Sequence, residues 1–155
     1  MTGAPKPPAS VLFVCTQNAV RSPMAAGLLR RKAGGRVHVR SCGVRGDREV
    51  DGYAVAVMDE VGVDLHDHHP QSIDTLDDTL FDLVVTLSAE ADVVVRDMLR
   101  ADAVTIDHWP MAEPDSHFET REQRLASYRD LREALTAKID ALFADWPAAP
   151  LPAGE

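Results

Sequence analysis

A cysteine and an arginine stand six positions apart, followed at once by a serine and a proline, within the segment VLFVCTQNAVRSPMAAGLL (11–29). A thiolate is a strong nucleophile, and it forms more readily at a helix N-terminus or beside an arginine. Cys15 would have both neighbours, and the planar fork of Arg21 could bind two oxygens of a phosphate or arsenate. We therefore predict an oxyanion site formed by Cys15 together with Thr16, Gln17, Asn18, Ala19, Val20, Arg21 and Ser22.

The elements around this segment would place it where anions bind. Residues 11–14 are a continuous β-prone run of the kind buried in a parallel sheet, and Cys15 follows at its carboxyl end. Ser22 and Pro23 are typical of the N-cap and first residue of a helix. The loop between strand and helix would then offer unpaired N–H groups and the positive end of a helix dipole.

The same cysteine–arginine spacing occurs a second time, in CGVRGDR (42–48). Glu49 and Val50 follow it in place of Ser-Pro and a helix, and the acidic side chains there would repel a phosphate. We predict that Cys42 is a small buried residue, the usual place of a free cysteine. The same alternative, a core thiol at a strand end, exists for Cys15, but the flanking strand, Ser-Pro pair and helix disfavour it.

The rest of the chain alternates strands and helices. Further strands are expected at 36–41, 81–87 and 103–106. Further helices are expected at 52–62, 89–99 and 120–142, the last opened by a capping box at Thr120. Four strands alternating with helices indicate an α/β fold, a single-domain doubly wound parallel sheet. Ligands of such sheets bind beyond the carboxyl ends of the strands, where Cys15 would lie.

Composition narrows the class of partner and the cellular compartment. The chain has 155 residues, two cysteines without a CxxC pair and a net charge of −9. The charge argues against nucleic acid or an anionic membrane as a partner. The cysteine usage, with no signal peptide or membrane-spanning stretch in the sequence, favours the cytoplasm. We expect a monomer or weak homodimer with a domain at 10–146 and disordered Pro/Ala/Gly-rich tails at 1–9 and 147–155.

The run CTQNAVRSPMA (15–25) resembles the signature of the low-molecular-weight protein tyrosine phosphatases, whose superfamily includes thioredoxin-linked arsenate reductases. The resemblance extends from about Ser10 to Leu142. It implies strand order 2-1-3-4, a phosphate loop after the first strand, a phosphocysteine on Cys15, phosphoryl oxygens bound by Arg21, and no cofactor. It also implies that a hydrogen-bonded set supports the loop, at Asn18, Ser22, Ser41 and His68.

The histidine-rich run HDHHP (66–70) has two interpretations. Imidazoles and a carboxylate suit zinc, but neighbours in a loop before a proline rarely point at one centre. We expect no metal site, and instead a solvated loop from which His68 alone turns inward to brace the catalytic loop.

A phosphatase also needs a carboxylic acid to protonate the leaving oxygen. The family carries Asp-Pro before its last helix, and this chain has Glu113-Pro114 there, with Asp115 next. Acids near prolines are also ordinary turn residues. We take Glu113 as the general acid and Asp115 as the alternative. Trp109 suits either a wall for an aromatic leaving group or a residue at the edge of the core.

Three functions are compatible with these residues. The leading hypothesis is a phosphomonoesterase of the tyrosine-phosphatase type acting on a phosphorylated protein or aryl phosphate, with the Ser22 hydroxyl donating to the Cys15 sulfur. A non-catalytic phosphate-binding module is suggested by Glu113 and by Gln17, where many members have glycine. An arsenate reductase would need resolving thiols, yet Ser88 and Val95 occupy the candidate positions. Only an external thiol could then complete arsenate reduction.

Overall fold

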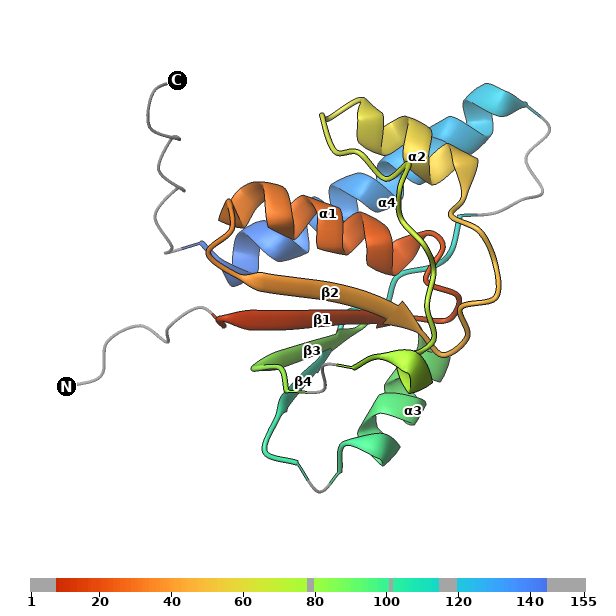
Figure 1. Cartoon of the computed structure of the whole chain (residues 1–155). Coiled ribbons are helices and arrows are strands. Elements are labelled where there is room, and N and C mark those ends of the chain that lie inside the picture. Colours follow the sequence, from red (N-terminus) through yellow and green to blue (C-terminus); the bar gives the residue numbers. More distant parts are fainter. Residues whose placement is uncertain (1–7, 78–79, 101, 115–119, 145–155) are drawn as a thin grey trace.

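Four parallel strands form one sheet in the order β2-β1-β3-β4. They are β1 (Ser10–Cys15), β2 (His38–Gly43), β3 (Leu83–Thr86) and β4 (Thr105–His108). Helices α1 (Arg21–Ala33), α2 (Gly52–Asp59) and α4 (Arg121–Leu142) lie on one side of the sheet and α3 (Ala89–Met98) on the other (Figure 1). A short 3-10 turn, η1 (Ile73–Thr75), precedes β3. The predicted doubly wound α/β fold and its strand order are confirmed.

The structure is a computed structural model that describes residues 8–77, 80–100, 102–114 and 120–144. Apart from Pro8 and Ala9, the predicted tails 1–9 and 147–155 lie outside these ranges. Ala9 pairs with the sheet: its N–H donates to the Asp82 carboxylate at 2.8 Å, and its carbonyl accepts from the His38 N–H at 2.9 Å. Within the described ranges, no helix combines the length and apolar character needed to cross a membrane.

The central strand β1 faces two separate cores because its side chains alternate across the sheet. Val11 and Phe13 lie in the larger core with residues of α1 and α4, whereas Leu12 and Val14 pack with residues of α3. Cys42 is paired in register with Val14, belongs to the α3-side core and is fully buried. Its predicted role as a buried thiol is confirmed.

Two helices begin at side-chain caps, one of which is the capping box predicted at Thr120. At the start of α4, the Thr120 hydroxyl accepts from the Gln123 N–H at 3.1 Å, and the Gln123 side chain accepts from the Thr120 N–H at 3.2 Å. This capping box satisfies two N–H groups that the helix leaves free. Ser88 caps α3 by accepting from the Ala91 N–H at 3.1 Å. The stripe that buries α4 is Leu125, Tyr128, Leu131, Leu135 and Ile139, with Leu142 partly buried beyond it.

The start of α1 corrects the predicted cap. The helix begins at Arg21, its N-cap is Val20, and no side chain caps it. Ser22 lies inside the first turn, fully buried, and its hydroxyl contacts the loop around Cys15. The predicted N-cap role of Ser22 is therefore wrong, because its hydroxyl contacts the Cys15 sulfur and does not cap the helix.

Other boundaries move by a few residues. Strand β4 pairs with β3 over Thr105–His108 rather than 103–106, because Thr105 is the residue in register with Leu83. Helix α2 ends at Asp59 and buries Ala54, Val57 and Met58. Val55 and Val61, in and just after the helix, are only partly buried.

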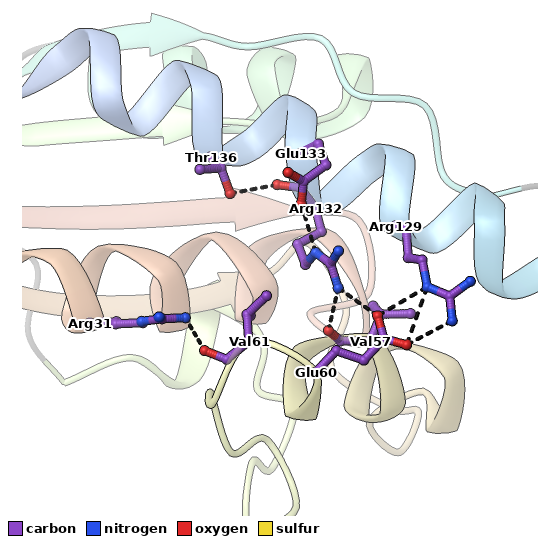
Figure 2. Close-up of polar contacts among 8 residues, drawn as sticks. All are labelled: Arg31, Val57, Glu60, Val61, Arg129, Arg132, Glu133 and Thr136. Carbon is purple, nitrogen blue, oxygen red and sulfur yellow. Dashed lines mark hydrogen bonds and ion pairs between the residues drawn. The ribbon is translucent and has the colours of Figure 1, made fainter.

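A network of charged side chains joins the C-terminal end of α2 to α4 (Figure 2). The Glu60 carboxylate accepts from Arg129 at 2.7 Å and from Arg132 at 2.8 Å. Arg132 also donates to the Val57 carbonyl at 2.8 Å, and Arg31 on α1 donates to the Val61 carbonyl. These contacts hold α2 against the long helix and so position the loop that precedes α2.

Candidate active site

The predicted oxyanion loop runs from the end of β1 to the start of α1, at the carboxyl edge of the sheet. Cys15 is 2% exposed, and its sulfur lies 3.0 Å from the Ser22 hydroxyl oxygen. The Asn18 N–H donates to the same sulfur at 3.2 Å. Two polar groups therefore face the sulfur, and hydrogen bonds to a charged form stabilise that form.

Asn18 organises the interior of this loop. It is fully buried with φ 58°, a conformation that asparagine tolerates better than most residues. Its side-chain amide donates to the hydroxyls of Ser22 at 2.7 Å and Ser41 at 3.0 Å. Its side-chain oxygen accepts from the Gln71 N–H at 2.9 Å. Gln71 is a partner that the sequence did not indicate, because a backbone donor has no residue signature.

His68 completes the set that the resemblance implied. Its Nε2 lies 2.9 Å from the Asn18 carbonyl oxygen, so the ring donates there. Burial is the main cause that lowers the pKa of His68, which favours the neutral ring at pH 7. The structure thus brings Asn18, Ser22, Ser41 and His68 together behind the loop.

The neighbouring histidines face away from the loop. His69 is exposed, and the ring of exposed His66 lies 2.7 Å from Asp64 and 3.7 Å from Asp59. Those three exposed side chains have ligand atoms within 4.8 Å of one another. The Asp64 partner raises the pKa of His66 above its ordinary value. The run therefore divides as expected, with His68 alone turned inward.

The second cysteine–arginine segment braces the first. The Val44 N–H donates to the Cys15 carbonyl and the Arg45 N–H to the Thr16 carbonyl, both at 2.9 Å. A side chain at Gly43 could not fit, because its Cβ would lie 2.3 Å from the Arg45 carbonyl oxygen. Residues 43–45 are thus the flank of the oxyanion loop and form no second site.

The turn before α3 touches the other flank. The Thr16 hydroxyl donates to the Ser88 hydroxyl at 3.0 Å, so the α3 cap is in direct contact with the residue after the nucleophile. Next to Ser88, Glu90 forms a two-pronged ion pair with Arg45 at 3.0 Å for each contact. Side chains of the β2–α2 loop and of α3 thus close around the phosphate loop.

Arg21 reaches across to the segment that follows β4. The side chain is 8% exposed, and one terminal nitrogen donates to the Met111 carbonyl at 3.0 Å. Its Nε is buried and has no partner within the described ranges. A buried donor without a partner is costly, and an oxyanion bound in the loop could accept from it.

Glu113 lies in the wall of a pocket of about 480 Å³ beside the phosphate loop. Ala19 and Val20 from the loop border this pocket, and Pro114 lies in its wall as well. The structure therefore places Glu113 beside the loop. Asp115 lies outside the described residues. Other walls of the pocket come from Arg48, Glu49, Asp51, Arg124 and Tyr128.

Trp109 belongs to the core. It is 3% exposed, packs on Phe13 with ring centroids 5.9 Å apart, and donates from its indole nitrogen to Asp107 at 2.9 Å. Of the two interpretations of this tryptophan, the structure supports the residue at the core. The pocket beside the loop therefore lacks an indole wall from this position.

Strand order and the cysteine–arginine loop together define the class. The sequence pattern described as "Low molecular weight phosphotyrosine protein phosphatase" matches residues 10–146, and the chain belongs to this family. Its relatives include the "Glutaredoxin arsenate reductase" of Synechocystis sp., 28% identical over 86% of this chain and 95% of that protein. The "Arsenate reductase" of Halalkalibacterium halodurans is 33% identical over 83% of this chain and 91% of its own.

Solved structures show the same two activities among neighbours. A structure described as an arsenate reductase in the oxidized state superposes with a TM-score of 0.73 at 26% identity, covering 88% of this chain and 98% of that one. The low molecular weight protein tyrosine phosphatase from T. tengcongensis gives a TM-score of 0.71 at 26% identity, with the same coverage. The chain is similar to phosphatases and to arsenate reductases alike.

Proposed function

We propose that this chain is a phosphomonoesterase of the protein-tyrosine-phosphatase type that acts through a phosphocysteine. The observation that carries the proposal is the setting of the Cys15 sulfur, which faces the Ser22 hydroxyl at 3.0 Å and the Asn18 N–H at 3.2 Å. Both contacts favour a thiolate. The buried Nε of Arg21 supports an oxyanion directly beside it.

The reaction takes two steps in this proposal. The Cys15 thiolate attacks phosphorus in line, so that the S–P bond forms while the ester P–O bond breaks, and Arg21 with the loop N–H groups stabilises the equatorial oxygens. Glu113 gives its proton to the leaving oxygen. Its carboxylate then takes a proton from water, whose oxygen attacks phosphorus and releases phosphate and the thiolate. Every group required belongs to the chain or is water.

The test is hydrolysis of an aryl phosphate in the presence of EDTA by the wild type and by Cys15→Ser. Cys42→Ser is the matched control, because that thiol is buried in the core on the α3 side. We expect turnover in the wild type and the control and none in Cys15→Ser. Comparable rates in wild type and Cys15→Ser would contradict the mechanism. Phosphate binding without turnover at pH 5–8 would instead favour a non-catalytic module.

Arsenate reduction with an external thiol is a second candidate, favoured by the arsenate reductases among the relatives. The Cys15 thiolate would attack arsenic with loss of water, and an external thiol would then attack the Cys15 sulfur, breaking the S–As bond so that its electron pair leaves with arsenic as arsenite. A second external thiol would displace Cys15 from the mixed disulfide and leave as an external disulfide. Cys42 faces the other core, and Ser88 stands where the resemblance places a resolving cysteine. An internal disulfide cascade therefore lacks its thiols.

Arsenite formation can distinguish the two routes of reduction. We expect no arsenate-dependent NADPH oxidation with thioredoxin and its reductase, because that route needs an internal disulfide. If the second candidate is right, glutathione with glutaredoxin will support arsenite formation, and Cys42→Ser will reduce arsenate at the wild-type rate. Activity with thioredoxin would show that an internal thiol does resolve the adduct.

A further inference from the structure

Two hollows beside the phosphate loop share Asp51 and Arg124 in their walls. The first, of about 480 Å³, borders Ala19 and Val20 of the loop, and the second, of about 330 Å³, lies between the N-terminal ends of α2 and α4. Together they make a path that leads from the phosphate loop to the first turn of α4. We call it the arginine groove, after the three arginines that line it, Arg48, Arg121 and Arg124.

The three arginines have no carboxylate partner within the described ranges. Elsewhere on the surface, Arg45 pairs with Glu90 and Arg129 with Glu60. Arg124 is held by stacking, with its guanidinium carbon 4.2 Å from the centre of the Tyr53 ring. Its Nε is buried without a hydrogen-bond partner among those residues. A positioned cation with unused donors is suited to bind an anion.

Both oxygens of the Asp51 carboxylate in the groove are already occupied as hydrogen-bond acceptors. One Asp51 oxygen accepts from the N–H groups of Tyr53 and Ala54 at 2.8 and 3.1 Å. The other accepts from the Tyr128 hydroxyl at 3.0 Å. Glu113 carries a proton in the proposed acid step. Glu49, which is exposed, is the remaining carboxylate among the described lining residues.

We infer that the arginine groove binds carboxylate groups that flank the phosphorylated residue, so that acidic phosphopeptides are preferred substrates. This inference rests on the proposed function for the phosphoryl position and extends it to the rest of the substrate. A chain of net charge −9 repels an acidic peptide as a whole. A preference for acidic over neutral peptides must therefore come from local cations. Tighter binding of the acidic peptide would point to the groove, because the net charge of the chain favours the neutral one.

The test compares binding of two phosphotyrosine peptides, one flanked on both sides by glutamates and the other by glutamines, to Cys15→Ser by fluorescence anisotropy. We expect the glutamate peptide to bind about fivefold more tightly at low salt, the size of one or two partly exposed charge pairs. Arg48→Gln and Arg124→Gln should each bring the two affinities to within about twofold. Arg48 lies in an exposed loop, so its replacement does not put the fold at risk.

Two further variants sharpen the comparison. Glu49→Gln should increase the preference for the glutamate peptide, because it removes the opposing charge. Arg100→Gln makes the same change of charge at an exposed arginine that lies 3.7 Å from Asp97 outside the groove, and it should keep the wild-type preference. An equal loss in Arg100→Gln would show that net charge and not the groove sets the preference, which would overturn the inference.

The outcomes separate this inference from the proposed function. If aryl phosphate is hydrolysed but both peptides bind Cys15→Ser equally, or neither binds, the groove proposal is wrong and the phosphatase proposal stands. If no phosphate ester is hydrolysed but the glutamate peptide binds more tightly and Arg48→Gln abolishes the difference, the groove proposal stands and the phosphatase proposal is wrong.

Discussion

The sulfur of Cys15 and the hydroxyl oxygen of Ser22 lie 3.0 Å apart, both buried where β1 gives way to α1. The hydroxyl oxygen accepts from the Asn18 amide at 2.7 Å, and its single proton has two acceptors in reach, the Cys15 sulfur at 3.0 Å and the Cys42 carbonyl at 3.3 Å. A charged sulfur is the stronger acceptor of the two. A hydrogen bond to a charged partner contributes about 1.5–3 kcal/mol. Ser22 is therefore a positioning partner of the nucleophile rather than a helix cap.

Ser22→Ala should slow alkylation of Cys15 by iodoacetamide at pH 7 by about tenfold, because it removes the hydroxyl that can donate a hydrogen bond to the reacting sulfur. Cys42 will not contribute, since burial raises the pKa of its thiol to about 12. Cys15→Ser, which should show no labelling, verifies this. Equal alkylation rates in Ser22→Ala and the wild type would show that the contact does not activate the sulfur.

Asn18→Ala should lower the free energy of unfolding by about 3 kcal/mol, because it removes three side-chain hydrogen bonds, two of them buried, and leaves the Gln71 N–H without its acceptor. Asn18→Gly loses the same bonds, but glycine adopts φ 58° without strain, so we expect it to be less damaging by about 1 kcal/mol. Urea denaturation measures both. A glycine variant no more stable than the alanine variant would show that the backbone there is unstrained.

Local sequence patterns were enough to predict the elements that neighbouring residues define. The apolar run 11–14 and the capping box at Thr120 are defined by neighbouring residues, and both were predicted correctly. Ser22 misled the prediction of the cap because a hydroxyl at a helix start serves equally well to satisfy a helix or to contact a neighbouring sulfur.

Local sequence patterns could not predict the long-range hydrogen bonds that hold the site together. The Gln71 N–H on Asn18 and the Arg45 N–H on Thr16 are backbone donors, which every residue but proline carries. The contact between Arg21 and the Met111 carbonyl joins positions 90 residues apart. Such pairings depend on how β1, β2 and β4 are arranged in the sheet, which no local pattern specifies. The resemblance supplied Ser41 and His68, which no local pattern would have selected.

Glu60→Gln should lower the free energy of unfolding at pH 7 by about 1 kcal/mol, a value kept small because the carboxylate is partly exposed. Arg129 and Arg132 lower the pKa of Glu60 from 4.5 to about 2 (Figure 2). A lowered folded-state pKa contributes stability above pH 4.5 that is lost as the pH falls towards 2. The difference between the wild type and Glu60→Gln should therefore shrink over that range.

Chemical denaturation at pH 7, 4 and 2.5 measures this dependence. Asp102→Asn, in the turn between α3 and β4, is the control for loss of a surface carboxylate outside the network. Added salt should also reduce the Glu60 effect at pH 7, because ions screen exposed pairs. A difference that stays constant from pH 7 to 2.5 would show that the ionised carboxylate does not join α2 to α4.

Peroxide should oxidise Cys15 without forming a disulfide to Cys42. Strands β1 and β2 are paired, but Cys15 belongs to the core on the α1 side of the sheet and Cys42 to the core on the α3 side. Disulfides need facing Cβ atoms. Mass spectrometry of proteolytic fragments, which separates Cys15 from the five methionines that peroxide can also oxidise, should place a gain of about 16 Da or its multiples on Cys15 in the wild type and in Cys42→Ser alike. A loss of about 2 Da in the wild type alone would reveal an internal disulfide and revive a reductase cascade.

The general acid is the last residue to be tested. Glu113 lines the pocket beside Ala19 and Val20, and the following Pro114 biases Glu113 towards extended backbone. Glu113→Gln should lower kcat/KM for phenyl phosphate, which reports the phosphoryl-transfer step, by about 10²-fold or more, since its leaving oxygen needs a proton. The loss for nitrophenyl phosphate should be far smaller, because nitrophenolate leaves without one. Asp115→Asn should stay near the wild type with both substrates.

The ratio of the two substrates' rates isolates the proton donor from other damage. A variant that merely distorts the loop lowers kcat/KM for both esters, whereas loss of the acid lowers kcat/KM for the poor leaving group alone. Hydrolysis of the phosphocysteine, in which Glu113 acts as the base, is common to both esters and does not enter this ratio. The extra methylene of glutamate shifts the carboxyl by about one bond length, and about 1 Å of misplacement can cost ~10²-fold. Should Asp115→Asn lose the phenyl phosphate rate while Glu113→Gln keeps it, Asp115 is the acid.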